Sequence, residues 1–208
     1  MDKEKFRQAL IATNDLEQFY EESLQGNDIW YFSDFLKVEN PSRRYDQIKV
    51  MIATRLNLSV SEIAIVGSAK LGFSIAPTKQ KMFRDFCGEH ADEEKISDID
   101  VSIVSAELFN RLWVAYYELK YSKGLPYKDY QFLSKNIFKK FLMINPEIRD
   151  HPILSDWFRQ IEPCVKDLQT LHGIAHDVNY RVYESWSAMK KYHVAGLGSL
   201  KKCISGEG

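Results

Sequence analysis

The sequence has few cysteines and no long apolar run, and each shortage excludes a class of protein. Its 208 residues include only three cysteines, Cys87, Cys164 and Cys203, which are widely spaced and form no Cys-x-x-Cys pair. This pattern argues against a disulfide framework or a zinc site and favours reduced thiols. No apolar segment approaches the length that spans a bilayer, and no signal peptide is visible. We therefore expect a cytoplasmic protein that does not cross a membrane.

The sequence also lacks a strong charge of either sign. The net charge is −1, so any nucleic-acid contact requires a local basic patch rather than a global field. The most basic stretch contains Lys135, Lys139 and Lys140, with Arg149 nearby, and it is either such a contact or a solvated helix face. Hydrophobic residues make up 45% of the chain, which is enough for a sizeable core.

Two short apolar runs with polar ends form the centre of the sequence. The first, residues 63–66, ends in Gly67 and Ser68, and the second, residues 101–104, follows directly on residues 97–100. Both runs are rich in β-branched residues, which predicts strands. Alternate side chains of a strand share a face, so Asp98 and Asp100 should point the same way, with Ile99 in the core.

The polar ends of these strands suggest a site for a metal and a phosphate. Two carboxylates about 6 to 7 Å apart on one strand face suit a hard divalent cation such as Mg²⁺ or Mn²⁺. Gly67 allows a sharp turn and a close approach of backbone to ligand. Ser68 offers a hydroxyl and a backbone N–H, and residues 69–71, which include Lys70, can begin a helical turn whose N–H groups attract phosphate.

A strand ending in Gly-Ser, followed by a strand that carries Asp-x-Asp, resembles the nucleotidyltransferase superfamily, whose fold is that of DNA polymerase beta. The resemblance covers about 40 residues. It implies that Gly67 and Ser68 contact the triphosphate of an NTP and that Asp98 and Asp100 bind the metals. In this sequence 31 positions separate Gly67 from Asp98, more than is usual in the family, and the excess lies in a polar insertion at 75–95. Loop closure becomes only slowly more costly with length, so such an insertion is tolerated.

The family usually has a third carboxylate on a later strand. Residues 177–183 alternate apolar and polar side chains, which predicts that strand. Asp177 is the candidate acid, although Asn179 is the alternative occupant of that position and would weaken metal binding. Arg181, on the same face, could contact a phosphate through two parallel hydrogen bonds. An ordinary edge strand with exposed polar residues is the other interpretation.

The resemblance and the hydrophobic periodicity together predict an α+β fold with a small mixed sheet flanked by helices. We expect one domain over 1–208, with a helical part at 1–60, the core strands at 61–104, and helices with the later strand at 105–208. The expected caps are Thr13 or Asn14, Ser42 and Ser105. The expected segments are two helices within 3–24, an aromatic-rich segment at 28–38, helices at 42–56, 106–122, 129–143 and 153–171, and a final helix at 184–202 broken at Gly196 and Gly198.

Three hypotheses for function remain open at this point. The first is a metal-dependent nucleotidyltransferase that moves a nucleoside monophosphate from an NTP to a hydroxyl on an unknown acceptor, which is RNA, a protein or a small molecule. The second is a degenerate module of the same fold that binds nucleotide or a partner protein. The third is a member of a toxin or antiphage system. The sequence does not determine the oligomeric state.

Overall fold

The computed structural model describes residues 2–78, 81–87 and 96–206 and divides the chain into two compact units. The first unit collects three separate segments, Met1–Tyr45, Ile65–Asp100 and Lys190–Gly208. The second comprises Asp46–Ala64 and Val101–Met189. The boundaries between the units fall within these elements: α3 (Pro41–Leu56), β1 (Ile63–Val66), β2 (Ile99–Val104) and α8 (Trp186–Ser205).

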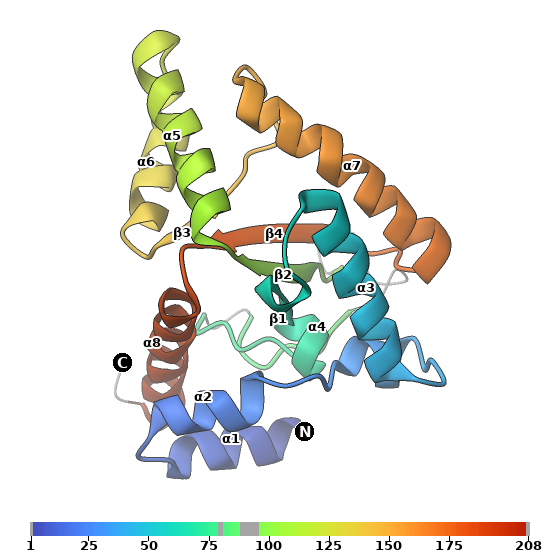
Figure 1. Cartoon of the computed structure of the whole chain (residues 1–208). Helices are drawn as coiled ribbons and strands as arrows, with labels where there is room; N and C mark the ends of the chain where they lie inside the picture. The colour runs from blue at the N-terminus through green and yellow to red at the C-terminus, as the bar shows by residue number, and fades with distance from the viewer. Residues whose placement is uncertain (1, 79–80, 88–95, 207–208) are drawn as a thin grey trace. The chain divides into compact units, whose positions relative to one another are not determined.

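The four strands form one mixed sheet in the order β1-β2-β4-β3 (Figure 1). Here β3 is Phe141–Met143 and β4 is Val178–Tyr183. These two strands pair antiparallel, with Leu142 opposite Val182. Both of these residues are buried, so the pair contributes to the core. The α+β class with a small sheet is therefore confirmed.

The first unit packs its helices around aromatic and leucine side chains. It contains α1 (Lys3–Ala12), α2 (Leu16–Leu24), the π-helical turn η1 (Tyr31–Phe35) and the one-turn helix α4 (Ser68–Leu71). The carboxylate of Asp15, rather than Thr13 or Asn14, caps α2, since it accepts from the N–H groups of Glu17 and Gln18. The core joins α1, α2, α4 and α8 through Phe6, Leu10, Phe19, Tyr20, Leu24, Leu71, Phe73, Leu197 and Leu200.

The aromatic-rich segment at 28–38 belongs to this packing. Tyr31 and Phe32 are buried, and the rings of Trp30, Tyr31 and Phe35 all contact Phe86 at centroid distances of 5.5 to 5.7 Å. Aromatic side chains contribute large buried areas, so this cluster stabilises the unit.

The second unit contains η2 (Val60–Glu62), α5 (Ala106–Ser122), α6 (Tyr127–Ile137) and α7 (Pro152–His172), together with β3 and β4. The inner faces of α5 and α7 bury Leu108, Leu112, Tyr116, Leu119, Leu154, Trp157, Ile161 and Leu168. Arg55 of α3 pairs with Asp167 of α7, with nitrogen and oxygen 2.6 Å apart. The ion pair joins α3 to α7, and the buried residues of α5 and α7 contribute to the core of this unit.

Three further predictions about the helices were wrong. The segment 129–143 is a helix that ends at Ile137 followed by the strand β3, because Phe141–Met143 pairs with β4. Helix α8 continues through Gly196 and Gly198 without the expected break. Asn40, rather than Ser42, caps α3, because its side-chain oxygen accepts from the N–H of Arg43 at 3.0 Å; Pro41 therefore occupies the first helical position, which suits its fixed φ.

The part of the chain that the structure describes contains no helix with both the length and the apolar character needed to cross a bilayer. The expected insertion at 75–95 lies partly outside the described residues. Within the described part, Phe73 and Asp85 form an antiparallel bridge, and the N–H of Phe86 donates to the carbonyl of Gly72. Residues 73–74 therefore pair with residues 83–85 directly after the end of α4.

Candidate active site at the ends of strands β1 and β2

Strand β1 ends in a backbone conformation that requires glycine. Gly67 has φ 70° and ψ −148°, a region that residues with a Cβ essentially do not occupy. The N–H of Ile65, two residues earlier, donates to the hydroxyl of Tyr45 at 3.1 Å, which fixes the end of the strand from the side. The chain therefore turns sharply at a defined place and enters α4 at Ser68.

The backbone of Gly67 lies directly against the side chain of Asp100. A Cβ placed on Gly67 would be 2.8 Å from Oδ2 of Asp100, closer than real Cβ atoms approach a neighbour. Both residues belong to the first unit. The structure thus brings the Gly-Ser turn and the second aspartate of the Asp-x-Asp sequence together, even though the insertion separates them along the chain.

The two aspartates alternate with a buried isoleucine. Ile99 is 1% exposed, whereas Asp98 and Asp100 are each half-buried and so remain accessible to water and ions. Asp98 directly precedes β2, and its neighbour Ser97 is fixed by two hydrogen bonds to Cys87: the Ser97 N–H donates to the Cys87 carbonyl, and the Cys87 N–H donates to the Ser97 hydroxyl, each at 3.0 Å. The entry into β2 is therefore held in place.

Ser68 begins the one-turn helix α4 and is half-buried. The turn is closed by the N–H of Gly72, which donates to the Ser68 carbonyl at 2.8 Å. The far end of α4 packs tightly, because a Cβ on Gly72 would lie 2.7 Å from the indole of Trp30. The sequence gives no signal that Trp30 holds α4 in this way, because the two residues lie far apart along the chain.

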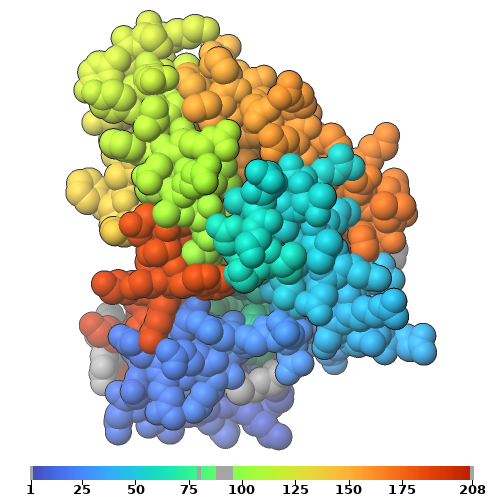
Figure 2. Space-filling model, viewed as in Figure 1, coloured from blue at the N-terminus to red at the C-terminus, as the bar shows by residue number. Residues whose placement is uncertain are grey.

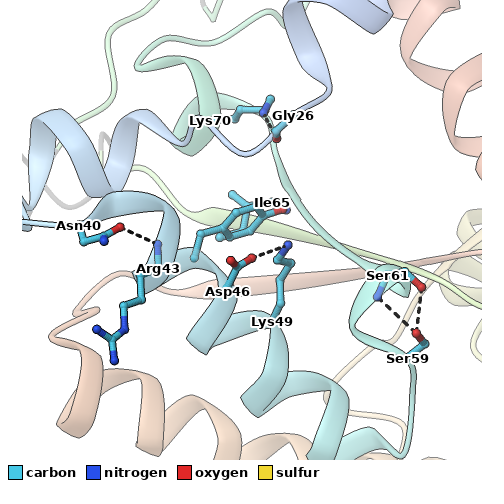
Figure 3. Close-up of polar contacts among 10 residues, drawn as sticks. Gly26, Asn40, Arg43, Asp46, Lys49, Ser59, Ser61, Ile65 and Lys70 are labelled. Atoms are coloured by element: carbon cyan, nitrogen blue, oxygen red, sulfur yellow. Dashed lines mark hydrogen bonds and ion pairs between the residues drawn. The ribbon is translucent and has the colours of Figure 1, made fainter.

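Lys70 contacts the loop after α2. Its side chain is buried, and its ammonium donates to the carbonyl of Gly26 at 2.9 Å (Figure 3). The ammonium also donates to the carbonyl of Asp28 at 3.3 Å. Burial lowers the pKa of this ammonium, and the negative charge of Asp28 partly opposes that effect. Lys70 therefore anchors the loop to α4 in this structure, and a direct contact of Lys70 with a phosphate stays a prediction.

The remaining predicted residues, Asp177 and Arg181, belong to the second unit. Asp177 is exposed and directly precedes β4. The guanidinium of Arg181 lies 5.1 Å from the centroid of the Phe141 ring, and one of its nitrogens donates to the Tyr183 hydroxyl at 3.5 Å. Arg181 thus binds β4 to β3, and the assigned roles of Asp177 and Arg181 in catalysis and phosphate binding stay predictions.

The second unit also contains a cavity of about 330 Å³ beside α7 and β4. Its lining is mainly apolar and aromatic and includes Trp157, Phe158 and Tyr180. The two charged side chains in the lining, Arg149 and Glu162, form an ion pair at 2.7 Å. Because these charges balance, the cavity does not match the charge of a triphosphate.

The donor set of Asp98 and Asp100 fits a hard divalent cation. Two carboxylates supply the oxygen ligands that Mg²⁺ prefers, and Mg²⁺ commonly takes its other ligands from water and substrate phosphates. Within residues 2–78, 81–87 and 96–206, no three His, Cys, Asp or Glu side chains gather as a metal-binding group. A cation at this place would therefore rely on the aspartate pair together with phosphate oxygens. Comparison of this chain with protein-family models, with curated proteins and with solved structures finds no match.

Proposed function

We propose that this protein is a metal-dependent nucleotidyltransferase that moves a nucleoside monophosphate from an NTP to a hydroxyl acceptor. The observation that carries the proposal is the contact between Gly67 and the carboxylate of Asp100. It joins a turn suited to phosphate with a carboxylate suited to a cation, and an NTP complexed with Mg²⁺ presents both chemical groups.

Each proposed site residue of the first unit has its own role in binding. Asp98 and Asp100 would hold Mg²⁺ or Mn²⁺, which would offset charge on the phosphates and on the departing pyrophosphate. Ser68 donates its hydroxyl and backbone N–H to phosphate oxygens. Gly67 leaves space beside Asp100 that any side chain would fill. Lys70 positions α4 by holding the loop at Gly26 and Asp28.

The transfer itself is an in-line displacement at the α-phosphorus. The acceptor oxygen forms the new bond to phosphorus, and pyrophosphate leaves with the electron pair of the bond that breaks. The proton of the acceptor hydroxyl passes to a carboxylate, for which Asp177 is the candidate. The acceptor is RNA, a protein or a small molecule.

Binding is tested by titrating ATP, GTP, CTP and UTP by calorimetry in the presence of Mg²⁺ or Mn²⁺. Metal-dependent binding in the wild type should be lost in the double variant Asp98→Asn, Asp100→Asn. Asp46→Asn is the matched control, since Asp46 is an exposed aspartate that pairs with Lys49 on its own helix. Equal affinity in wild type and double variant would refute the site.

A binding module that does not catalyse transfer is the second candidate. It is favoured by the position of Asp177, which lies outside β4, and by Asn179, the exposed polar residue on that strand, whose amide carries no charge to hold a cation. Incubation with α-labelled NTPs, metal and a mixture of RNA, DNA and the protein itself distinguishes the candidates. Labelled product that disappears in Asp98→Asn supports the enzyme, and metal-dependent binding without product supports the module.

A further inference from the structure

A row of exposed aromatic side chains follows one face of α5. Trp113, Tyr117 and Tyr121 are spaced four residues apart and are 41%, 53% and 72% exposed. Their ring centroids are 6.0 Å apart between Trp113 and Tyr117 and 4.9 Å apart between Tyr117 and Tyr121. The opposite face of α5 supplies the core, so these three rings are not needed to bury the helix.

Helix α6 extends this surface. Tyr127 is 72% exposed and Tyr130 is 39% exposed. The ammonium of Lys120 on α5 lies 3.3 Å from the centroid of the Tyr130 ring, which places the two helices side by side in the second unit (Figure 1). We call Trp113, Tyr117, Tyr121, Tyr127 and Tyr130 the aromatic surface. Helix α5, which carries three of these residues, is visible in the space-filling view (Figure 2).

Large exposed apolar patches on a folded protein mark interaction sites, because leaving them in water is unfavourable. Two of the rings, Tyr127 and Tyr130, also have contacts that order them. Gln131 donates to the Tyr127 hydroxyl at 2.8 Å, and Lys120 covers one face of Tyr130. A surface that is already ordered loses less entropy when it binds.

The same region carries the positive charge that the chain as a whole lacks. Residues 106–140 contain seven Lys or Arg and three Asp or Glu, a net charge of +4, so the rest of the chain carries −5. Lys120 lies over the Tyr130 ring, while Lys123 and Lys140 also pair with Asp150 and Glu184. The excess of positive charge along α5 and α6 is complementary to a polyanion.

The chemistry of the rings favours single-stranded nucleic acid over a protein helix as the partner. A groove for an amphipathic helix is lined by aliphatic side chains as well as rings, whereas Val114 is the one exposed large aliphatic side chain on described residues of α5. Unpaired bases stack on aromatic side chains whatever their sequence, and lysines near the rings contact the phosphates. The ring centroids lie 6.0 Å and 4.9 Å apart. Both separations exceed the 3.4 Å rise per base of a paired strand and suit an extended strand.

We propose that the aromatic surface of α5 and α6 binds single-stranded nucleic acid by stacking bases on Trp113, Tyr117 and Tyr121 and by pairing phosphates with the surrounding lysines. This inference does not rest on the proposed transferase activity, since it involves neither the aspartate pair nor a metal.

The test is fluorescence anisotropy with a fluorescein-labelled 20-residue oligo(U) and oligo(dT), performed in EDTA. We expect wild type to bind both strands, and a duplex of the same length to bind more weakly. Tyr117→Ala should weaken binding about 5- to 100-fold per ring lost, and Tyr117→Phe should retain most of the affinity. Lys120→Ala should reduce the dependence of affinity on salt concentration. Circular dichroism checks that each variant folds.

Trp186→Ala is the matched control, because Trp186 is another exposed aromatic side chain but lies on α8, and it should bind like wild type. Asp98→Asn, Asp100→Asn should also bind the oligonucleotide normally, which separates this surface from the aspartate site. The proposal is overturned if wild type binds no oligonucleotide, if Tyr117→Ala binds as tightly as wild type, or if the duplex binds as well as the single strand. Self-association of wild type that Tyr117→Ala abolishes, without oligonucleotide binding, would assign the surface to a second copy of the chain instead.

Discussion

The α-carbon of Gly67 faces Oδ2 of Asp100 with no room for a methyl group between them. This relationship gives a sharp test of the site. In Gly67→Ala, the new methyl must push Asp100 aside, and the backbone must adopt a conformation unfavourable to alanine by about 1–3 kcal/mol. We expect loss of metal-dependent nucleotide binding by calorimetry and a lower free energy of unfolding in urea.

The Gly173→Ala variant distinguishes the effect of backbone strain from the effect of displacing Asp100. Gly173 also has positive φ, but a Cβ there meets nothing within 4 Å. This variant should lose stability and keep nucleotide affinity. If Gly67→Ala behaves in the same way, the space beside Asp100 is not part of a binding site.

Lys70 should matter for stability, because its ammonium satisfies two carbonyls in a buried setting. Lys70→Met leaves the carbonyls of Gly26 and Asp28 without this donor, at a cost of about 1–3 kcal/mol. Urea unfolding monitored by circular dichroism measures this change. A variant as stable as wild type would show that the loop at Gly26 and Asp28 is held by other contacts.

The lowered pKa of Lys70 also predicts a pH dependence. Burial places the folded-state pKa below the ordinary value of 10.5. Between these two values the unfolded chain binds more protons than the folded chain, so the contribution of Lys70 to stability increases as pH rises through that window. The difference in free energy of unfolding between wild type and Lys70→Met should therefore grow in favour of wild type from neutral pH to pH 10.5. A constant difference would contradict this assignment.

The three thiols should react at very different rates. Cys164 is buried, and desolvation raises the pKa of its thiol to about 11, so little thiolate forms at neutral pH. Cys203 is exposed on α8. In a thiol-modification assay followed by mass spectrometry, Cys203 should react first and Cys164 only when urea unfolds the chain. Rapid modification of Cys164 in the native protein would show that α7 opens readily.

Asp177 distinguishes a catalytic role from a binding role. If its carboxylate acts on the acceptor hydroxyl, Asp177→Ala should slow label transfer far more than it weakens nucleotide affinity, because an interaction made in the transition state alters turnover. Asp156→Ala is a control on an aspartate of α7 that pairs with a neighbour on its own helix. Unchanged transfer in Asp177→Ala would remove the third carboxylate from the mechanism and leave the aspartate pair in place.

Local sequence patterns predicted the central strands and most helices. The strands and helices that were predicted wrongly depend on contacts between segments far apart in the sequence. The alternation around Ile99 was sufficient to predict that Ile99 is buried and that Asp98 and Asp100 are less so, although the rest of β2 is buried on both faces. Strand β3 has three residues and shows no period of its own, and it exists because Leu142 pairs with Val182. The proximity of Gly67 and Asp100 was expected only through the resemblance, since no local pattern reports it.

Glycine in α8 shows how packing overrides propensity. Each glycine costs a helix about 1 kcal/mol relative to alanine, which predicted a break at Gly196 and Gly198. In the structure a Cβ on Gly198 would touch Leu16 of α2 at 3.5 Å. That separation is ordinary van der Waals contact, so the space would admit a Cβ, and the core around Leu197 and Leu200 keeps α8 continuous.

The arrangement of the first unit has a consequence for synthesis on the ribosome. Phe6 of α1, Leu71 of α4 and Leu200 of α8 belong to one buried cluster. Because these residues lie far apart in sequence, the cluster forms through non-local contacts, which form slowly. A nascent chain that already contains Gly67 and Asp100 still lacks Leu197 and Leu200. The candidate active site therefore gains its full support only after α8 has been translated, and a partly made chain exposes the apolar faces of α1 and α2 until then.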